Sequence, residues 1–280
     1  MHFISKKIAL YNSTMSTSNR ARWVFDCGNW FPSENDWSIA SRSIQPEEKE
    51  RIGRFVFKQD AKRSIIGQLM IRKFLSEATH LPWSKIKTKR DQNNKPIMEG
   101  FNFNISHDGN LVVLAGEKET IVGIDIMRNC YNGGKSLNEF FRLMHRNFHI
   151  NEWRYINKGT DTEKTNSFYR FWCLKESYVK ATGTGLTIDL KKICFIPKSE
   201  LMKDVILSDT ELFIDGKLMA DWKFHEYLFD NHTITVCVKG PITPIKFKFI
   251  NFQDLISNAE MILEEDKNYC KLFLSKEEKP

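Results

Sequence analysis

The first half of the chain carries two kinds of hydrophobic pattern. Residues 44–80 place apolar side chains near helical spacing, and Pro46 followed by acids suits a first helical turn. Residues 101–125 are rich in β-branched and aromatic residues, with a polar turn at 108–110. The positions that define these patterns are Ile65, Leu69, Ile71 and Leu75, and then Phe101, Phe103 and Ile105. The pattern predicts two helices in front of a small antiparallel sheet.

The second half has the same plan of helices followed by strands. Residues 136–148 and 167–182 have the pattern of amphipathic helices, and they precede strand-like segments at 211–229 and 230–240. We therefore predict an α+β fold of two similar halves. The predicted boundaries are 1–128 for the first half, 129–264 for the second half and 265–280 for a mobile tail.

Charge and composition narrow the possible partners. The 42 Lys and Arg exceed the 35 Asp and Glu, and the net charge of +7 favours nucleic acid, a phosphate-rich cofactor or an acidic protein. The basic residues are too dispersed for a polybasic nucleic-acid arm. No apolar run approaches the ~20 residues of a membrane span, and the basic first residues lack a signal-peptide core. We expect a cytosolic protein, with an organellar presequence as the alternative.

The six cysteines lie far apart in the sequence. None belongs to a C-x-x-C pair or lies in a histidine cluster, so neither a zinc site nor a disulfide framework is indicated. We expect reduced thiols that are mostly buried.

The segment 168–185, "FYRFWCLKESYVKATGTG", combines aromatic residues with charges. Glu176 and Lys180 lie four residues apart, about 40° around a helix, in the favourable order for an ordinary surface ion pair. Aromatic and aliphatic residues cover most of the helix circumference, so the alternative is that these charges face a metal, a phosphate or each other. Gly183 and Gly185 suit a left-handed helix end.

Other candidate residues lie in the first half. Asp125 follows a β-branched run, where a carboxylate commonly caps a turn but also offers the hard oxygen ligands that magnesium prefers. Ser106 and His107 are neighbours on a strand and should point to opposite faces, so we expect a phosphate-contacting histidine rather than a general base. Arg51, Arg90 and Lys95, taken singly, resemble solvated surface charges.

Four ordered segments together resemble one family. "GID" at 123–125 and "FWCLKESYVKATGTGL" about fifty residues later match the two-part signature of the Sfp-type 4'-phosphopantetheinyl transferases, and "NKP" and "NFNISH" lie upstream in the family order. The resemblance implies a monomer of two similar halves related by a pseudo-twofold axis, with coenzyme A in the cleft between them. It also implies transfer of 4'-phosphopantetheine from coenzyme A to a serine of a carrier protein, which releases adenosine 3',5'-bisphosphate.

The resemblance also implies roles for individual residues. Asp125 and Glu176 would hold Mg²⁺, Glu176 would act as base toward the carrier serine, and Lys180 would stabilise the leaving phosphate. Lys175 matches a signature position without an evident role. The implied carriers are acyl and peptidyl carrier domains of the fatty acid synthase and aminoadipate-reductase types, with neither nucleic acid nor membrane as partner. The residues implied to contact coenzyme A are Arg51, Arg90, Asn93, Asn94, Lys95, Asn104, Ile105, Ser106, His107, Asp125, Glu176 and Lys180.

Two positions depart from the family pattern. Met127 stands where many members have a second acid, so water would replace one metal ligand. Asn94 stands where a small residue is expected before Lys-Pro, and asparagine tolerates a left-handed turn.

Two other functions remain open. A metal-dependent nuclease or phosphodiesterase would also use Asp125 and Glu176, and its binding would depend steeply on salt. A binding module without turnover would have less need for Asp125, Glu176 and Lys180.

Overall fold

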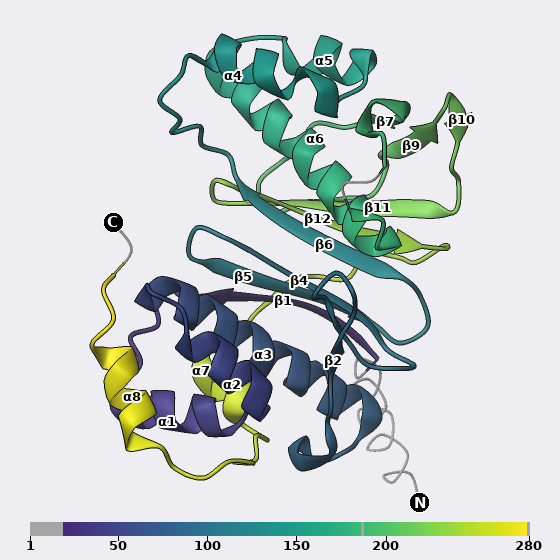
Figure 1. The fold of residues 1–280 in the computed structure, drawn as a ribbon. Helices are drawn as coiled ribbons and strands as arrows, with labels where there is room; N and C mark the ends of the chain where they lie inside the picture. The colour runs from purple at the N-terminus through teal and green to yellow at the C-terminus, as the bar shows by residue number, and fades with distance from the viewer. Residues whose placement is uncertain (1–18, 186–187, 279–280) are drawn as a thin grey trace, which may run out of the picture.

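The central strand of the first half, β5 (Leu111–Glu117), is buried along its whole length because its two faces meet two different cores. Val112 and Leu114 face the helices of the first half, whereas Val113 and Ala115 face a second sheet. The computed structural model describes residues 19–185 and 188–278 and has two sheets packed face to face, with helices over both outer faces (Figure 1). The predicted α+β fold class is confirmed, while the pseudo-twofold relation stays a prediction.

The elements of the first half confirm the helices predicted at 44–80. Strand β1 (Arg20–Asp26) lies antiparallel to β5, which pairs in turn with the antiparallel β4 (Asn102–Asp108). Helix α3 (Lys58–Thr79) packs on this sheet, and α1 (Glu34–Arg42) and α2 (Pro46–Gly53) pack on α3, with Pro46 in the first turn of α2 as expected. A separate hairpin and a 3₁₀ turn follow α3: β2 (Lys89–Arg90), β3 (Pro96–Ile97) and Trp83–Lys85.

The second sheet is antiparallel throughout. In spatial order it contains β6 (Val122–Arg128), β12 (His232–Lys239), β11 (Trp222–Phe229) and β8 (Ile206–Leu207). Its helices are α4 (Leu137–Met144), α5 (Ile150–Ile156) and α6 (Asp161–Thr182). A 3₁₀ turn at His145–Asn147 lies between α4 and α5, and another at Leu190–Lys192 follows α6 and leads into the next strand. A smaller sheet contains β7 (Ile193–Ile196), β9 (Glu211–Ile214) and β10 (Lys217–Leu218).

Strand β6 lies in a different sheet from the one expected. The sequence pattern grouped residues 101–125 in a single sheet, but β6 pairs with β12, and Asp125 lies opposite Thr235. Ile124 and Ile126 enter the core between the sheets, where they find apolar partners from both halves. The predicted boundary at residue 128 therefore falls after a strand that belongs to the second sheet.

Side chains join the two sheets where β4 lies beside β6. The backbone N–H of Ile124 donates to Asn104 Oδ1 at 3.2 Å, and that of Arg128 donates to Asp108 Oδ2 at 2.6 Å. These bonds satisfy backbone N–H groups at the edge of β6, which a neighbouring strand would satisfy in the middle of a sheet. Because Ser106 lies between Asn104 and Asp108 on the same face of β4, it is brought against β6 as well.

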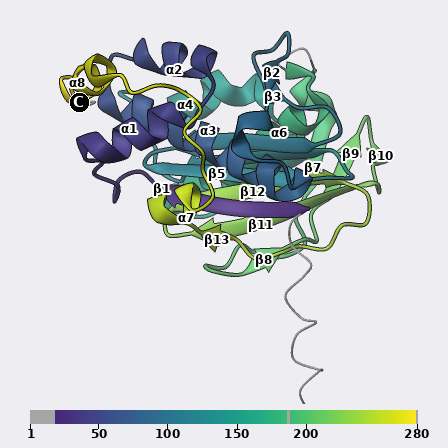
Figure 2. The same cartoon turned by 90° about the horizontal axis from the view of Figure 1, so that it is seen from below.

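The end of the chain returns to the first half. Strand β13 (Lys248–Phe249) runs parallel to β1, and α7 (Phe252–Ile256) contacts α3. Helix α8 (Lys267–Leu274) lies beside α1 and α2 (Figure 2), and its Phe273 ring stacks on Trp37 with 3.5 Å between ring centroids. Through residue 278, the structure therefore differs from the predicted mobile tail, because the apolar face of α8 is buried. Residues 248–264, assigned by prediction to the second half, likewise return to the first.

The remaining sequence expectations concern thiols and membranes. All six cysteines are free, and five of them are buried, as expected. Across residues 19–185 and 188–278, no helix combines the length and apolarity needed to cross a membrane. Residues 1–18, which carry the expectation about a signal or presequence, lie outside the described part of the chain.

Candidate active site

Gly123 sets the distance between β6 and α6. A Cβ atom at this position would lie 2.1 Å from the backbone oxygen of Ser177 and 2.5 Å from the backbone nitrogen of Ala181. Only glycine allows so close an approach of a helix backbone to a strand. Because alternate residues share a strand face, this contact also directs Asp125 toward α6.

Asp125 and Lys180 form an ion pair across this contact. Lys180 Nζ lies 2.6 Å from Asp125 Oδ1 and donates to Ser106 Oγ at 2.8 Å, and Ser106 Oγ donates to the same carboxylate oxygen at 2.9 Å. The other oxygen, Asp125 Oδ2, is buried and has no hydrogen-bond partner among the described residues. A buried carboxylate oxygen without a partner is costly and marks a position suited to a cation or a donor.

Glu176 lies on the cavity side of α6 rather than in a surface pair. Within the described residues its carboxylate forms no ion pair with Lys180, whose ammonium group faces Asp125 instead. The surface-pair alternative is therefore wrong. Burial raises the pKa of Glu176, and the nearby negative charge of Asp125 raises it further, while Lys180 acts in the opposite direction.

One cavity of about 410 Å³ brings together most of the residues implied to contact coenzyme A. Its walls come from the turn between β2 and β3, from β4 and from the C-terminal end of α6, which ends at a left-handed Gly183 as predicted. A cavity of this size is typical of small-molecule sites. The lining residues are Asp91, Asn93, Asn94, Lys95, Pro96, Phe103, Asn104, Ile105, Glu176, Val179, Lys180, Gly183 and Gly185.

The turn at 91–95 is shaped locally and attached to α6. Asp91 Oδ1 accepts hydrogen bonds from the backbone N–H groups of Asn93 and Lys95, at 2.8 and 2.9 Å, and Asn94 is left-handed with φ 60°. This φ confirms the turn expected at Asn94. Lys95 Nζ donates to the backbone oxygen of Lys180 at 3.3 Å, and Asn93 Nδ2 donates to that of Gly183 at 3.3 Å. These bonds connect the turn to the carbonyl end of the helix.

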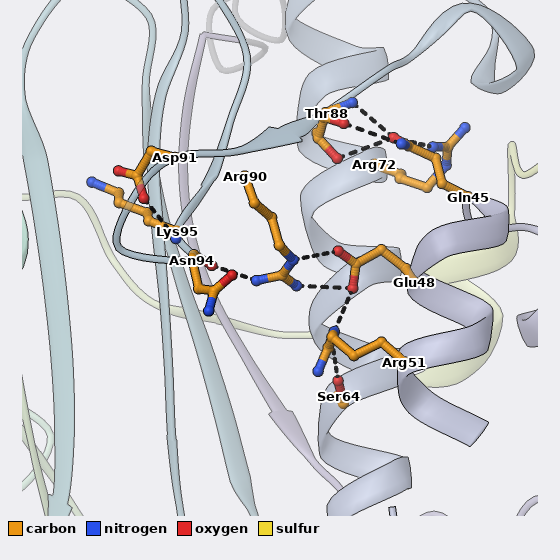
Figure 3. A network of polar contacts seen from close by, with 10 residues as sticks. All are labelled: Gln45, Glu48, Arg51, Ser64, Arg72, Thr88, Arg90, Asp91, Asn94 and Lys95. Carbon is orange, nitrogen blue, oxygen red and sulfur yellow. Dashed lines mark hydrogen bonds and ion pairs between the residues drawn. The ribbon is translucent and has the colours of Figure 1, made fainter. Parts of the chain in front are cut away.

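Arg51 and Arg90 form a second cluster outside the lining of this cavity (Figure 3). Both guanidinium groups bind the buried carboxylate of Glu48, and Arg90 also donates to the backbone oxygen of Asn94. Burial alone would raise the pKa of Glu48, but the hydrogen bonds and charges of the two arginines lower it below its ordinary value. Glu48 therefore carries its charge in this cluster, and the Arg90 contact links the cluster to the cavity turn.

His107 lies apart from Ser106, as the strand alternation predicted. Ser106 is buried against Asp125, whereas the exposed His107 projects from the other face of β4. Local desolvation lowers the pKa of His107, and the positive charges of Arg63 and Lys180 lower it further. A neutral imidazole in a basic neighbourhood is compatible with a hydrogen-bonding role toward an anion.

Lys175 has a structural environment that the sequence did not reveal. Its fully buried ammonium group lies 2.8 Å from Glu152 Oε2 and donates to the backbone oxygens of Leu190 and Ile193, at 2.9 and 2.7 Å. These three acceptors satisfy the three donors of an ammonium group. Lys175 thus connects α6 to α5 and to the segment that leads into β7, away from the cavity.

Sequence reasoning missed Glu48 and Asp91. Glu48 was interpreted only as an acid in the first turn of α2, although its spacing of three residues from Arg51 was a usable signal. Its contact with Arg90 spans 42 positions and had no local signal. Asp91 could have been found as the first residue of a polar turn.

The candidate ligands are of the kind that magnesium prefers, but there are few of them. Asp125 and Glu176 supply hard carboxylate oxygens, whereas Met127 cannot supply a third. Within residues 19–185 and 188–278 there is no group of three or more His, Cys, Asp or Glu arranged to hold a metal. A magnesium ion here would therefore depend on substrate phosphate and water for its remaining ligands, which is its usual preference.

Both halves match descriptions of one family. Residues 28–119 match "4'-phosphopantetheinyl transferase, N-terminal", and residues 121–237 match "4'-phosphopantetheinyl transferase superfamily". The chain belongs to the 4'-phosphopantetheinyl transferase superfamily, and its enzyme class is that of phosphopantetheinyl transferases.

Among individual relatives, the chain is similar to the L-aminoadipate-semialdehyde dehydrogenase-phosphopantetheinyl transferases of Pongo abelii and Homo sapiens. The identities are 42% and 41%, and each alignment covers 92% of this chain and 92% of the relative. It is 26% identical to the 4'-phosphopantetheinyl transferase Sfp of Bacillus subtilis, over 76% of this chain and 90% of that protein.

Proposed function

We propose that this transferase moves the 4'-phosphopantetheine group of coenzyme A to a serine hydroxyl of an acyl or peptidyl carrier domain, with Mg²⁺. The observation that carries the proposal is that Glu176 and Lys180 line one cavity with the Asn93–Lys95 turn, while the buried Asp125 pairs with Lys180 beside it. An acid and a lysine in the cavity wall, with a second acid paired to that lysine, suit attack at phosphorus, where negative charge must be neutralised and a weak nucleophile activated.

In this reaction the serine Oγ–phosphorus bond forms while the bond from phosphorus to the leaving phosphate oxygen breaks. Glu176 takes the serine proton, directly or through water, and its raised pKa suits a base that works near neutral pH. Lys180 offsets the charge that develops on adenosine 3',5'-bisphosphate as it leaves. Asp125 and Glu176 would hold magnesium, which supplies charge neutralisation and orientation at the pyrophosphate when bound.

The choice of partners follows from charge and from the relatives. A net charge of +7 suits coenzyme A and carrier domains with acidic surfaces. The animal relatives carry L-aminoadipate-semialdehyde dehydrogenase in their names, so we include carriers of the aminoadipate-reductase type beside those of fatty acid synthase. We further propose that the enzyme acts as a monomer in the cytosol.

The direct test combines the protein, coenzyme A, magnesium and an apo carrier domain, with intact-mass measurement of the carrier. The expected result is a gain of one phosphopantetheine per carrier, which chelation of magnesium abolishes. A carrier whose modified serine is replaced by alanine is the control. Absence of a mass gain on fatty acid synthase and aminoadipate-reductase carriers alike would refute the proposal.

A further inference from the structure

Glu48 uses both carboxylate oxygens to hold two arginines. Oε2 accepts from Arg51 Nε at 2.9 Å and from an Arg90 terminal nitrogen at 2.8 Å, while Oε1 accepts from Arg90 Nε at 2.7 Å. Figure 3 shows the carboxylate between the two guanidinium groups. The contact with Arg90 has the two-pronged geometry that fixes the plane of a guanidinium group.

The three side chains differ in their access to solvent. The Glu48 side chain is 8% exposed, whereas those of Arg51 and Arg90 are 36% and 28% exposed. Among the described residues, Arg51 otherwise donates to Ser64 and Arg90 to the Asn94 backbone. Since a guanidinium group has five N–H donors, each arginine keeps donors that can reach a ligand. The buried acid thus lies beneath two oriented and partly exposed cations.

Glu48 is not the only residue that attaches α2 to the β2 segment within the described part of the chain. Gln45 Oε1 accepts from the backbone and the hydroxyl of Thr88, at 2.7 and 3.0 Å, and Gln45 Nε2 donates to the Thr88 backbone oxygen at 3.1 Å. These bonds fasten the two segments next to Arg90 (Figure 3). What Glu48 adds is the orientation of Arg51 and Arg90, and through Asn94 it also supports one wall of the cavity.

We propose that Glu48 is a positioning residue for coenzyme A: it holds Arg51 and Arg90 in the orientation in which they bind the phosphates of that substrate. This inference rests on the proposed function. When Glu48 is neutralised, orientation and net charge predict opposite changes in the affinity for coenzyme A, so a binding measurement can distinguish them. Neutralising Glu48 adds positive charge beside an anion, so charge alone predicts tighter binding. Loss of orientation predicts weaker binding, because each guanidinium group must then be ordered by the ligand itself.

The test compares coenzyme A binding by calorimetry in the full chain and in Glu48→Gln. Glu47→Gln is the matched control, because it removes one charge from the same helical turn at an exposed position. We expect the Kd of Glu48→Gln to rise about tenfold to a hundredfold, the range known for residues that orient metal ligands. Glu47→Gln should stay within about twofold. The KM for coenzyme A should rise more than kcat falls, and the KM for the carrier should not change.

A second measurement addresses the free enzyme. In wild type, the Nε–H groups of Arg51 and Arg90 should give slowly exchanging NMR signals, and both signals should shift when coenzyme A is added. Glu48→Gln should lose this protection. If Glu48→Gln does not fold, the wild-type protein alone tests the inference. Nε–H signals that exchange fast, or that do not shift when coenzyme A is added, would overturn the role of Glu48.

The outcomes separate the two proposals. A wild-type protein that binds no coenzyme A overturns the proposed function together with this inference. A wild-type protein that binds coenzyme A, with equal or tighter binding by a folded Glu48→Gln, overturns the inference alone.

Discussion

Two lysines of helix α6 lie five residues apart and have different surroundings. Lys175 is fully buried and pairs with Glu152, whose side chain is also inaccessible. Lys180 pairs with the buried Asp125, but its own side chain remains 29% exposed at the cavity. Both pairs join a lysine of α6 to an acid on another element. The difference indicates that accessibility, rather than pairing, separates a lysine that fastens the fold from one that can meet a substrate.

The largest effect should follow loss of the buried pair. Lys175→Met leaves Glu152 as an uncompensated buried acid, so we expect a loss of about 3–5 kcal/mol in the free energy of unfolding, measured with denaturant. Lys175→Met combined with Glu152→Gln should recover part of this loss. Coenzyme A affinity, measured where the variant is folded, should match wild type. A loss below about 1 kcal/mol would contradict the conclusion that Lys175 stabilises the fold more than Lys180 does.

Loss of the pair between Lys180 and Asp125 should mainly lower the rate of transfer. Lys180→Ala removes the cation proposed to stabilise the leaving phosphate, so we expect transfer to slow about 10²-fold. Its destabilisation should be smaller than that of Lys175→Met, since water can reach the cavity and solvate Asp125. Single-turnover assays and denaturant unfolding of the same variant measure both quantities. A transfer rate equal to wild type would refute the proposed role of Lys180.

The rate should also report the protonation of Glu176. Its pKa is raised by burial and by Asp125, and the proposed base is active only as the carboxylate. Transfer should therefore fall as the pH decreases through this raised pKa, by about tenfold per pH unit below it. The residual transfer by Glu176→Gln should lack this limb. A profile that shows no acidic limb, with chemistry rate-limiting, would exclude Glu176 as the base.

The smallest effect should come from an ion pair on the same helix whose acid is exposed to solvent. Lys164 Nζ lies 3.3 Å from Asp161, whose side chain is 80% exposed. Lys164→Met should change the free energy of unfolding by no more than about 0.5 kcal/mol and leave transfer unchanged, because water and salt screen such pairs. An effect as large as that of Lys175→Met would show that burial does not explain the comparison.

Short sequence motifs were enough to identify the two candidate acids and the candidate lysine. Asp125, Glu176 and Lys180 were identified from two short segments, and the Asn93–Lys95 turn and Asn104–Ile105 join them in or beside one cavity. The sequence did not reveal why Gly123 precedes the aspartate by two residues. The structure supplies the reason, since the α6 backbone occupies the space that a Cβ would need. Conversely, Arg51 and Arg90 lie outside the cavity lining, where both bind Glu48. The sequence pattern indicated only that Glu48 belongs to the first turn of a helix.

By itself, the sequence determined the α+β class, the helices at 44–80, the glycine end of α6 and the candidate chemical groups. These features depend on hydrophobic period, on backbone preferences and on short motifs, all of which act within a few residues. The tertiary structure decided the sheet that contains β6, the return of α8 to the first half and the partners of Lys175 and Glu48. Such pairings join residues tens to hundreds of positions apart, and whether a charge fastens the fold or faces a cavity depends on what packs against it.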